Sequence, residues 1–249
     1  MPAAIEVHDL VMTYGDLRAV DGVGFEVAEG EFFGILGPNG AGKTTTLEMV
    51  EGLREPDSGT ITVLGEPVWP RNPGLLPRVG VQLQASSFFE RLTAREQIHT
   101  FAALYGVPGA RGDEWIERVG LVDKADTRVE DLSGGQTQRL SIACALVHDP
   151  ELVFLDEPTA ALDPQARRNL WDLLRGINEA GRTVVLTTHY MDEAEVLCDR
   201  VAIMDRGRLL RLDTPAALVE ALDAPVRVVE KRGTLEDVFL DLTGREYRQ

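Results

Sequence analysis

Two separate stretches of this sequence have the residue types of a phosphate site. The first is Gly37-Pro38-Asn39-Gly40-Ala41-Gly42-Lys43-Thr44, which fits the pattern G-x-x-x-x-G-K-[ST] and follows an apolar run. Its glycines let the backbone bend so that successive N–H groups point into one concavity, and a helix beginning near Lys43 adds the positive end of its dipole. We expect this P-loop (residues 37–44) to hold a polyphosphate, with the Lys43 ammonium at the β and γ oxygens and Thr45 as a further contact.

The second stretch is Leu132-Ser133-Gly134-Gly135-Gln136, called the signature below. Ser133 is placed to cap a helix predicted over residues 136–147, but capping does not explain two glycines at a helix start. Such glycines weaken the helix, expose backbone N–H groups and permit close approach by a ligand. We therefore expect Ser133 and Gly135 to contact a γ-phosphate, with Gly134 between them and Gln136 as a supporting polar group. One nucleotide cannot fill two such sites, so the sequence predicts a sandwich of two chains.

Two acids follow an apolar run in Glu151-Leu152-Val153-Phe154-Leu155-Asp156-Glu157-Pro158. The run reads as a buried strand that delivers carboxylates at its C-terminal end, where ligands bind in open parallel sheets. Mg²⁺ prefers oxygen ligands, so we expect it to bind the Asp156 carboxylate and the Thr44 hydroxyl. Glu157 is expected to polarise the attacking water as general base. The alternative is a pair of solvated turn residues, which the need of the P-loop for a metal-binding acid disfavours.

Together, the P-loop and the signature resemble those of the ATP-binding subunits of ABC transporters, and the resemblance covers nearly the whole chain. It implies that the P-loop of one protomer holds ATP while the signature of the other closes over the γ-phosphate. It also implies an α/β fold, a P-loop NTPase of the ABC type. That fold has a central mostly parallel sheet, an antiparallel β flank, an inserted helical lobe and a short C-terminal accessory segment.

The resemblance assigns roles to His189 and Asp163. His189, in Thr187-Thr188-His189-Tyr190, would reach the γ-phosphate from the end of a strand, although a lone His is more often structural. Asp163 would lie in a loop that crosses the dimer interface. It can equally cap a helix that starts at Pro164, and both roles can hold at once.

Two more residues are assigned by the resemblance with an alternative beside each. Gln84 ends a strand predicted over residues 79–84 and would bind Mg²⁺ or a water. Gln82 lies on the same face of that strand, so only the resemblance favours Gln84. Tyr14 would stack on the adenine, while an aromatic there can also pack against the sheet.

Composition limits the partners of this 249-residue chain. It has 25 Lys and Arg against 41 Asp and Glu, and the net charge of −16 opposes nucleic-acid binding and adhesion to an anionic membrane. No run approaches the roughly 20 apolar residues of a spanning helix, and the N-terminus lacks a secretion signal. We expect a cytoplasmic protein with no direct membrane insertion, held at the inner face of the membrane by a partner. Cys144 and Cys198 lie in apolar helical settings and should remain reduced.

The order of patterns along the chain predicts its organisation. Residues 1–85 and 148–213 form the ATP-binding core, with an antiparallel flank built from strands near 5–14, 23–27 and 59–64. Residues 86–147 form a helical lobe that carries the signature, with helices near 94–105 and 113–120. Residues 214–249 form a small accessory segment with helices at 215–222 and 235–242 around a strand at 226–230.

The resemblance implies an ATPase that uses MgATP, dimerises with itself or with a related ATPase, and powers a separately encoded integral-membrane permease. The pattern at residues 234–244, with the residues after the P-loop, resembles exporters of drugs, antibiotics and other hydrophobic compounds. Three alternatives remain: an importer, a soluble ABC-type ATPase without a membrane partner, and a regulatory binder that does not hydrolyse ATP. The predicted general base Glu157 disfavours the last.

A candidate docking segment follows Gln84. Residues 85–92 hold the adjacent aromatics Phe88 and Phe89 before a helix start in which Thr93 and Glu96 fit a capping box. At least one of the two rings is hard to bury on the inner face of that helix. We expect this segment to form part of a groove for the permease, and the competing interpretation is core packing of the lobe.

Overall fold

The computed structural model describes residues 2–83, 88–160 and 162–221. Its larger sheet has the strand order β10-β9-β3-β8-β7-β6. The strands are β3 (Phe32–Leu36), β6 (Val79–Gln82), β7 (Leu152–Asp156), β8 (Thr183–Thr188), β9 (Arg200–Asp205) and β10 (Arg208–Asp213). All pair in parallel except β10, which runs antiparallel to β9. The predicted fold class, a P-loop NTPase built on a mostly parallel sheet, is confirmed.

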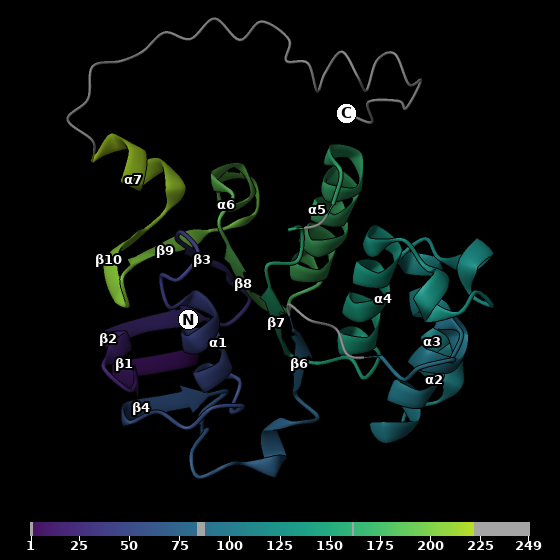
Figure 1. Ribbon diagram of the computed structural model, residues 1–249, viewed down its shortest axis with the longest axis horizontal. Coiled ribbons are helices and arrows are strands. Elements are labelled where there is room, and N and C mark those ends of the chain that lie inside the picture. The colour runs from purple at the N-terminus through teal and green to yellow at the C-terminus, as the bar shows by residue number, and fades with distance from the viewer. Residues whose placement is uncertain (1, 84–87, 161, 222–249) are drawn as a thin grey trace, which may run out of the picture.

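A second sheet forms the antiparallel flank that the sequence predicts (Figure 1). It contains β1 (Ala3–Tyr14), β2 (Leu17–Ala28), β4 (Ser58–Val63) and β5 (Glu66–Pro67) in the order β2-β1-β4-β5. The predicted start of β2 near residue 23 is wrong by six residues. A two-residue turn at Gly15, where φ is +57°, brings Leu17 directly opposite Tyr14, so β2 pairs with β1 along its whole length.

The strands β7 and β8 separate two hydrophobic cores. Val153 and Leu155 face a core shared with the helices, while Leu152 and Phe154 face a core shared with the antiparallel sheet and α1 (Lys43–Val50). This alternation follows from the period of two along a strand, and burial of both faces explains why the sequence of β7 is a continuous apolar run.

The helices between residues 94 and 146 pack on one another at one side of the larger sheet (Figure 1). They are α2 (Ala94–Leu104), α3 (Gly109–Arg118) and α4 (Gly134–Leu146). Two 3₁₀ turns, Val122–Lys124 and Val129–Asp131, lie between α3 and α4, and a third, Pro73–Leu75, comes before β6. The predicted start of α3 at residue 113 is wrong, because the helix begins directly after the extended Pro108. The exact bounds of the lobe, residues 86–147, stay a prediction.

Three further helices complete the described chain: α5 (Pro164–Glu179), α6 (Met191–Leu197) and α7 (Pro215–Glu220). The predicted strand at 226–230 and helix at 235–242 lie outside the described residues. Within residues 2–83, 88–160 and 162–221, no helix combines the length and apolarity needed to cross a bilayer. Cys144 and Cys198 are buried free thiols, as expected.

Candidate nucleotide site

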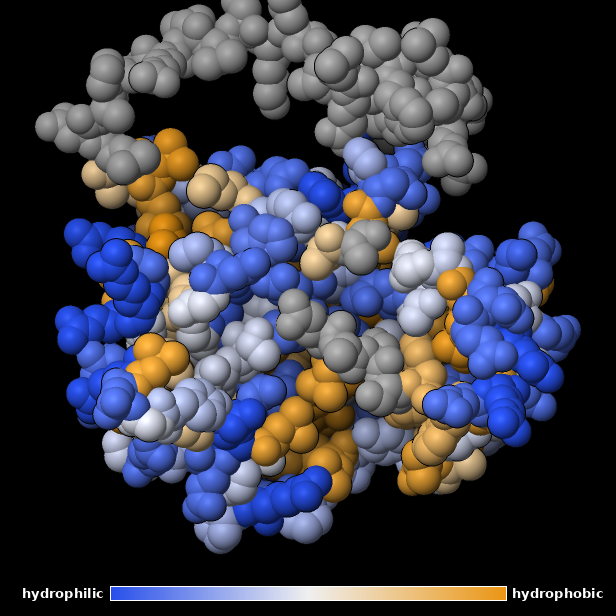
Figure 2. Space-filling model, viewed as in Figure 1, coloured by the Kyte–Doolittle hydropathy of each residue, from blue (hydrophilic) through white to orange (hydrophobic). Residues whose placement is uncertain are grey.

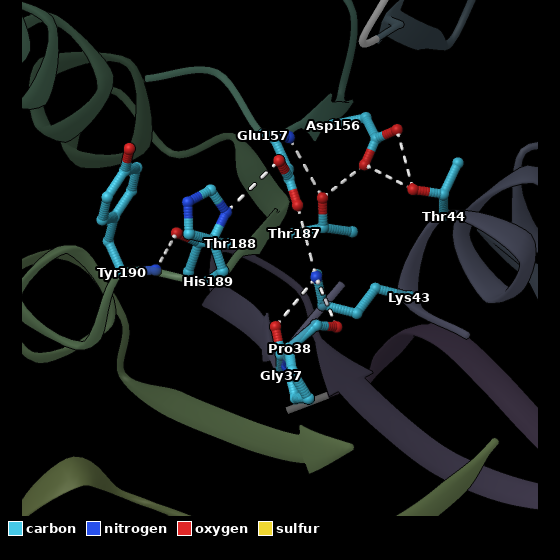
Figure 3. A network of polar contacts seen from close by, with 10 residues as sticks. All are labelled: Gly37, Pro38, Lys43, Thr44, Asp156, Glu157, Thr187, Thr188, His189 and Tyr190. Atoms are coloured by element: carbon cyan, nitrogen blue, oxygen red, sulfur yellow. Dashed lines mark hydrogen bonds and ion pairs between the residues drawn. The ribbon is translucent and has the colours of Figure 1, made fainter. Parts of the chain in front are cut away.

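The carboxyl ends of three neighbouring parallel strands bring the predicted phosphate and metal groups together. Leu36 at the end of β3 pairs with Thr188 of β8, and Thr187 pairs with Asp156 at the end of β7. The P-loop follows β3, Glu157 follows β7 and His189 follows β8, so all three enter the site from one edge of the sheet (Figure 3).

The Lys43 side chain lies inside the P-loop and is only 4% exposed. Its ammonium donates to the carbonyls of Gly37 at 2.9 Å and Pro38 at 3.2 Å, and lies 3.2 Å from Glu157 Oε1 (Figure 3). An ammonium has three donors, so these three acceptors satisfy it. A phosphate oxygen that binds Lys43 must therefore replace one of them, and Glu157 is the acceptor whose release would also free a carboxylate.

The glycines of the P-loop are required by close approach of the backbone. A Cβ at Gly37 would come within 2.3 Å of the Met204 carbonyl, and Gly42 has a φ of +97°. The groove that the loop encloses is lined by Asn39, Gly40, Gly42, Lys43, Thr44, Thr45 and Glu157.

Asp156 lies between two threonine hydroxyls. Thr44 Oγ1 is 3.3 Å from Oδ1 and 3.1 Å from Oδ2, and Thr187 Oγ1 donates to Oδ1. Burial raises the pKa of the Asp156 carboxyl, and the two hydroxyls oppose that rise. A Mg²⁺ ion would fit here, since it takes few protein oxygens and fills its shell with waters and phosphate oxygens. No three His, Cys, Asp or Glu side chains form a metal cluster in the described ranges.

Glu157 connects the P-loop side of the site to His189. Its Oε1 meets Lys43, and its Oε2 lies 3.3 Å from His189 Nδ1. Its backbone has a φ of +46° and is held there by N–H bonds to the carbonyl and the hydroxyl of Thr187. A non-glycine residue in the left-handed region needs such support, and the conformation turns the 10%-exposed carboxylate out of the strand direction into the site.

The signature lies at the start of α4 and forms a capping box. Ser133 Oγ accepts from the Gln136 N–H at 3.4 Å, and Gln136 Oε1 accepts from the Ser133 N–H at 2.9 Å. The predicted helix start at Gln136 is therefore wrong by two residues, because this box begins the helix at Gly134. The Gln136 side chain, expected as a supporting phosphate contact, here caps the helix. None of the residues that line the P-loop groove comes from the signature.

The remaining predicted residues have different outcomes. Asp163 caps α5, with Oδ1 accepting from the Ala166 N–H at 2.9 Å, so its capping role is confirmed and its interface role stays a prediction.

Tyr14 is 42% exposed with the Arg54 guanidinium 5.3 Å from its ring centroid, which excludes burial of the ring in the sheet. Gln84 lies outside the described residues. The competing Gln82 is buried, and its amide donates to the carbonyl of Leu83.

Sequence reasoning missed the role of Thr187. Its hydroxyl contacts both Asp156 and the Glu157 N–H, so one side chain orients the two acids. The signal was present, because a threonine pair at the end of a buried strand, directly before His189, is polar where its neighbours are apolar.

Comparison with known proteins agrees with this geometry. A family model described as ABC transporter matches residues 20–160. A Nod factor export ATP-binding protein I from Paraburkholderia xenovorans (strain LB400) is 45% identical, over 87% of this chain and 73% of that protein. This chain is an ATP-binding subunit of the ABC transporter family. A protein of the same name from Rhizobium sp. (strain N33) is 44% identical, and the match covers 98% of this chain and 98% of that protein.

Solved structures extend the likeness to the whole ATP-binding subunit. MJ0796, described as a bacterial ABC transporter cassette in dimeric form, has a TM-score of 0.78 at 28% identity, covering 85% of this chain and 98% of that one. CbiO1 from Clostridium perfringens, described as part of the complex cbiONQ, has a TM-score of 0.79 at 26% identity, covering 98% and 96%. MJ0796 is also known in a post-hydrolysis state with ADP and Pi. As a member of this family the chain is an ATPase that uses ATP with Mg²⁺.

Proposed function

We propose that this subunit hydrolyses MgATP at a site shared by two protomers and thereby drives export through a separately encoded permease at the inner face of the membrane. The observation that carries the proposal is the polar network in which Lys43, Asp156 and Glu157 meet at the ends of β3 and β7. The names of the similar proteins support export, and they do not support a drug or antibiotic in particular. The substrate class, a hydrophobic compound, rests on the residue 234–244 pattern, which lies outside the described residues.

The chain's own residues divide the chemistry. Asp156 and Thr44 would hold Mg²⁺, which neutralises charge on the phosphates, and Lys43 would bind the β and γ oxygens. Release of Glu157 from Lys43 leaves a carboxylate that can accept the proton of a water. His189, 3.3 Å from that carboxylate, is placed to donate a hydrogen bond at the γ-phosphate and to orient Glu157.

The second half of the site would come from another protomer. The signature presents backbone N–H groups at the start of the 13-residue helix α4, whose dipole favours an anion. Gly134 has open space around the position of a Cβ, so a ligand can approach its backbone. Two protomers would close over two nucleotides and open after hydrolysis. The nucleotide's different affinities for the closed and the open dimer would supply the work.

A separate surface would receive the permease. An apolar groove of about 230 Å³ lies among the C-terminal end of α1, the segment before β6 and the end of α2. Its lining includes the exposed side chains of Leu53, Leu76, Leu83 and Tyr105. Figure 2 shows apolar surface in the lower centre of the molecule, where Figure 1 places β6. Apolar surface gathered around one groove is typical of a protein contact.

Phe89 adds an exposed aromatic ring just before α2. Its ring is 51% exposed and lies 6.5 Å from that of Phe101 of α2, whereas Phe88 packs against the helical core. The core interpretation therefore holds for Phe88, and Phe89 is the residue left for a docking contact.

Co-purification with a permease whose gene lies beside this one tests the function. We expect the complex to hydrolyse ATP faster than the isolated subunit, and Lys43→Ala to abolish the activity of both. In inside-out vesicles that contain the complex, export appears as ATP-dependent uptake of a hydrophobic fluorescent dye. A neighbouring gene for a secreted binding protein, with ATP-dependent uptake only in right-side-out vesicles, would indicate import instead.

A further inference from the structure

Glu51 is a buried carboxyl group that the nucleotide chemistry does not use. It is the C-cap residue directly after α1, and it contributes to the lining of the apolar groove. Both carboxylate oxygens are inaccessible to solvent, and neither has a hydrogen-bond partner within the described part of the chain. Burying an unpaired charge is costly, so an acid here calls for a partner or a proton.

The charged groups around Glu51 do not supply that partner. Burial, with the charges of Asp156 and Glu48 adding to it, raises the pKa of Glu51 to about 8. The nearest cation along the chain, Arg54, is engaged by Glu48 at 2.7 Å and lies over the ring of Tyr14. Arg71 and Tyr105 also line the groove, but both are solvent-exposed and neither bonds to Glu51.

We propose that, on docking, the Glu51 side chain turns its carboxyl group into the apolar groove and accepts there one Lys or Arg side chain from the permease segment that enters the groove. The inference rests on the proposed function, since it names the chemistry of that partner. A single carboxylate among apolar lining residues accepts a cation at only one position, so it fixes the register of the entering segment. Cytoplasmic loops of membrane proteins are rich in Lys and Arg, and the chain's own net charge of −16 attracts such a loop.

Pairing changes the protonation of Glu51. With a pKa of about 8, the carboxyl of the undocked subunit holds its proton at neutral pH. A cation beside it favours the carboxylate, so docking releases a proton. The affinity for the permease should therefore increase as the pH rises towards 8 and level off above it.

The test compares Glu51→Gln with Glu55→Gln, which removes the same charge from an exposed position four residues later. The detergent-solubilised permease that co-purifies with the wild-type subunit is bound to each immobilised subunit between pH 6.5 and 8.5. We expect Glu51→Gln to dock about 30-fold or more weakly at the upper end, because truncating one member of a buried charge pair costs about 2 kcal/mol or more. We also expect it to lose the pH dependence, while Glu55→Gln retains wild-type docking.

The free energy of unfolding shows whether weaker docking comes from misfolding of the variant. Since the folded pKa of Glu51 lies above the ordinary 4.5, the wild type should lose free energy of unfolding between pH 4.5 and 8 relative to Glu51→Gln. The variant should thus be at least as stable as the wild type at pH 8. Glu51→Lys should lose docking and regain it when the matching permease cation is replaced by Glu. Equal affinity and an equal pH profile in wild type and Glu51→Gln would overturn the inference, whereas a wild type that never docks would reject the proposed function.

Discussion

Glu157 is the predicted general base, and its left-handed backbone directs its carboxylate into the site. Glu157→Gln keeps the shape of the side chain and removes its ability to accept a proton, so we expect ATP hydrolysis to fall by roughly 100-fold or more. Nucleotide binding should persist, because the amide competes less than a carboxylate for the Lys43 ammonium. Phosphate release and titration with labelled ATP measure the two effects.

The same variant should accumulate as a closed dimer, since closure needs ATP and opening needs hydrolysis. Gel filtration with and without MgATP measures this, and a control without Mg²⁺ should stay monomeric. A Glu157→Gln protein that turns over ATP at the wild-type rate would remove Glu157 from the mechanism.

Thr187 is expected to control the affinity for Mg²⁺. Thr187→Val removes a donor that holds down the pKa of Asp156, which burial already raises. The proton then competes better with the metal, so the Mg²⁺ concentration for half-maximal ATPase should increase, and should increase most at low pH. Thr187→Ser retains the hydroxyl and is the matched control. A Thr187→Val enzyme with an unchanged Mg²⁺ requirement at every pH would contradict this role.

The elements that carry the site could be predicted because the patterns around them are local. The apolar run of β7 and the glycines of the P-loop fix a strand end and a tight loop within a few residues of sequence. The predicted helix starts were less accurate. The helix α4 begins two residues before the predicted Gln136, because the Gln136 side chain bonds back to Ser133, a contact that depends on side-chain direction. The positions of Thr187 and Glu51 depend on packing between distant segments, which no local pattern encodes.

The segment before α2 offers a prediction at the scale of an element. Phe88 packs on the helical core, so Phe88→Ser should lower the free energy of unfolding by about 2 kcal/mol, less than for a fully buried ring. Phe89 is exposed, so Phe89→Ser should change that free energy by about 0.5 kcal/mol or less. Denaturant titration of the two variants measures the difference.

Of the two variants, Phe89→Ser should be the one that affects binding to the permease. Phe89→Ser should keep the ATPase activity of the isolated subunit and co-purify poorly with the permease in detergent. Exposed Leu17, at the start of β2 in the antiparallel sheet, provides a control in Leu17→Ser, which should co-purify normally. If the folded Phe89→Ser protein binds the permease as tightly as wild type does, the docking surface lies elsewhere.

At the scale of the whole molecule, the question is whether the P-loop and the signature act in one chain or across two. The described chain places them at separate elements, the P-loop after β3 and the signature at α4, and no signature residue lines the P-loop groove. Lys43→Ala should weaken nucleotide binding to a single protomer, because it removes a charge-assisted contact to phosphate. Ser133→Arg should leave that binding intact and prevent closure, since a long charged side chain then occupies the N-terminus of α4.

Mixing the two inactive variants gives the decisive result. In a mixed dimer, the Ser133→Arg protomer supplies an intact P-loop and the Lys43→Ala protomer supplies an intact signature, so one of the two composite sites has both parts. Each variant alone has no such site. ATPase activity that appears only on mixing, and that increases with the fraction of mixed dimers, would require the two parts to act across the interface. Loss of nucleotide binding by monomeric Ser133→Arg, with no activity on mixing, would instead place the signature in the same chain's site.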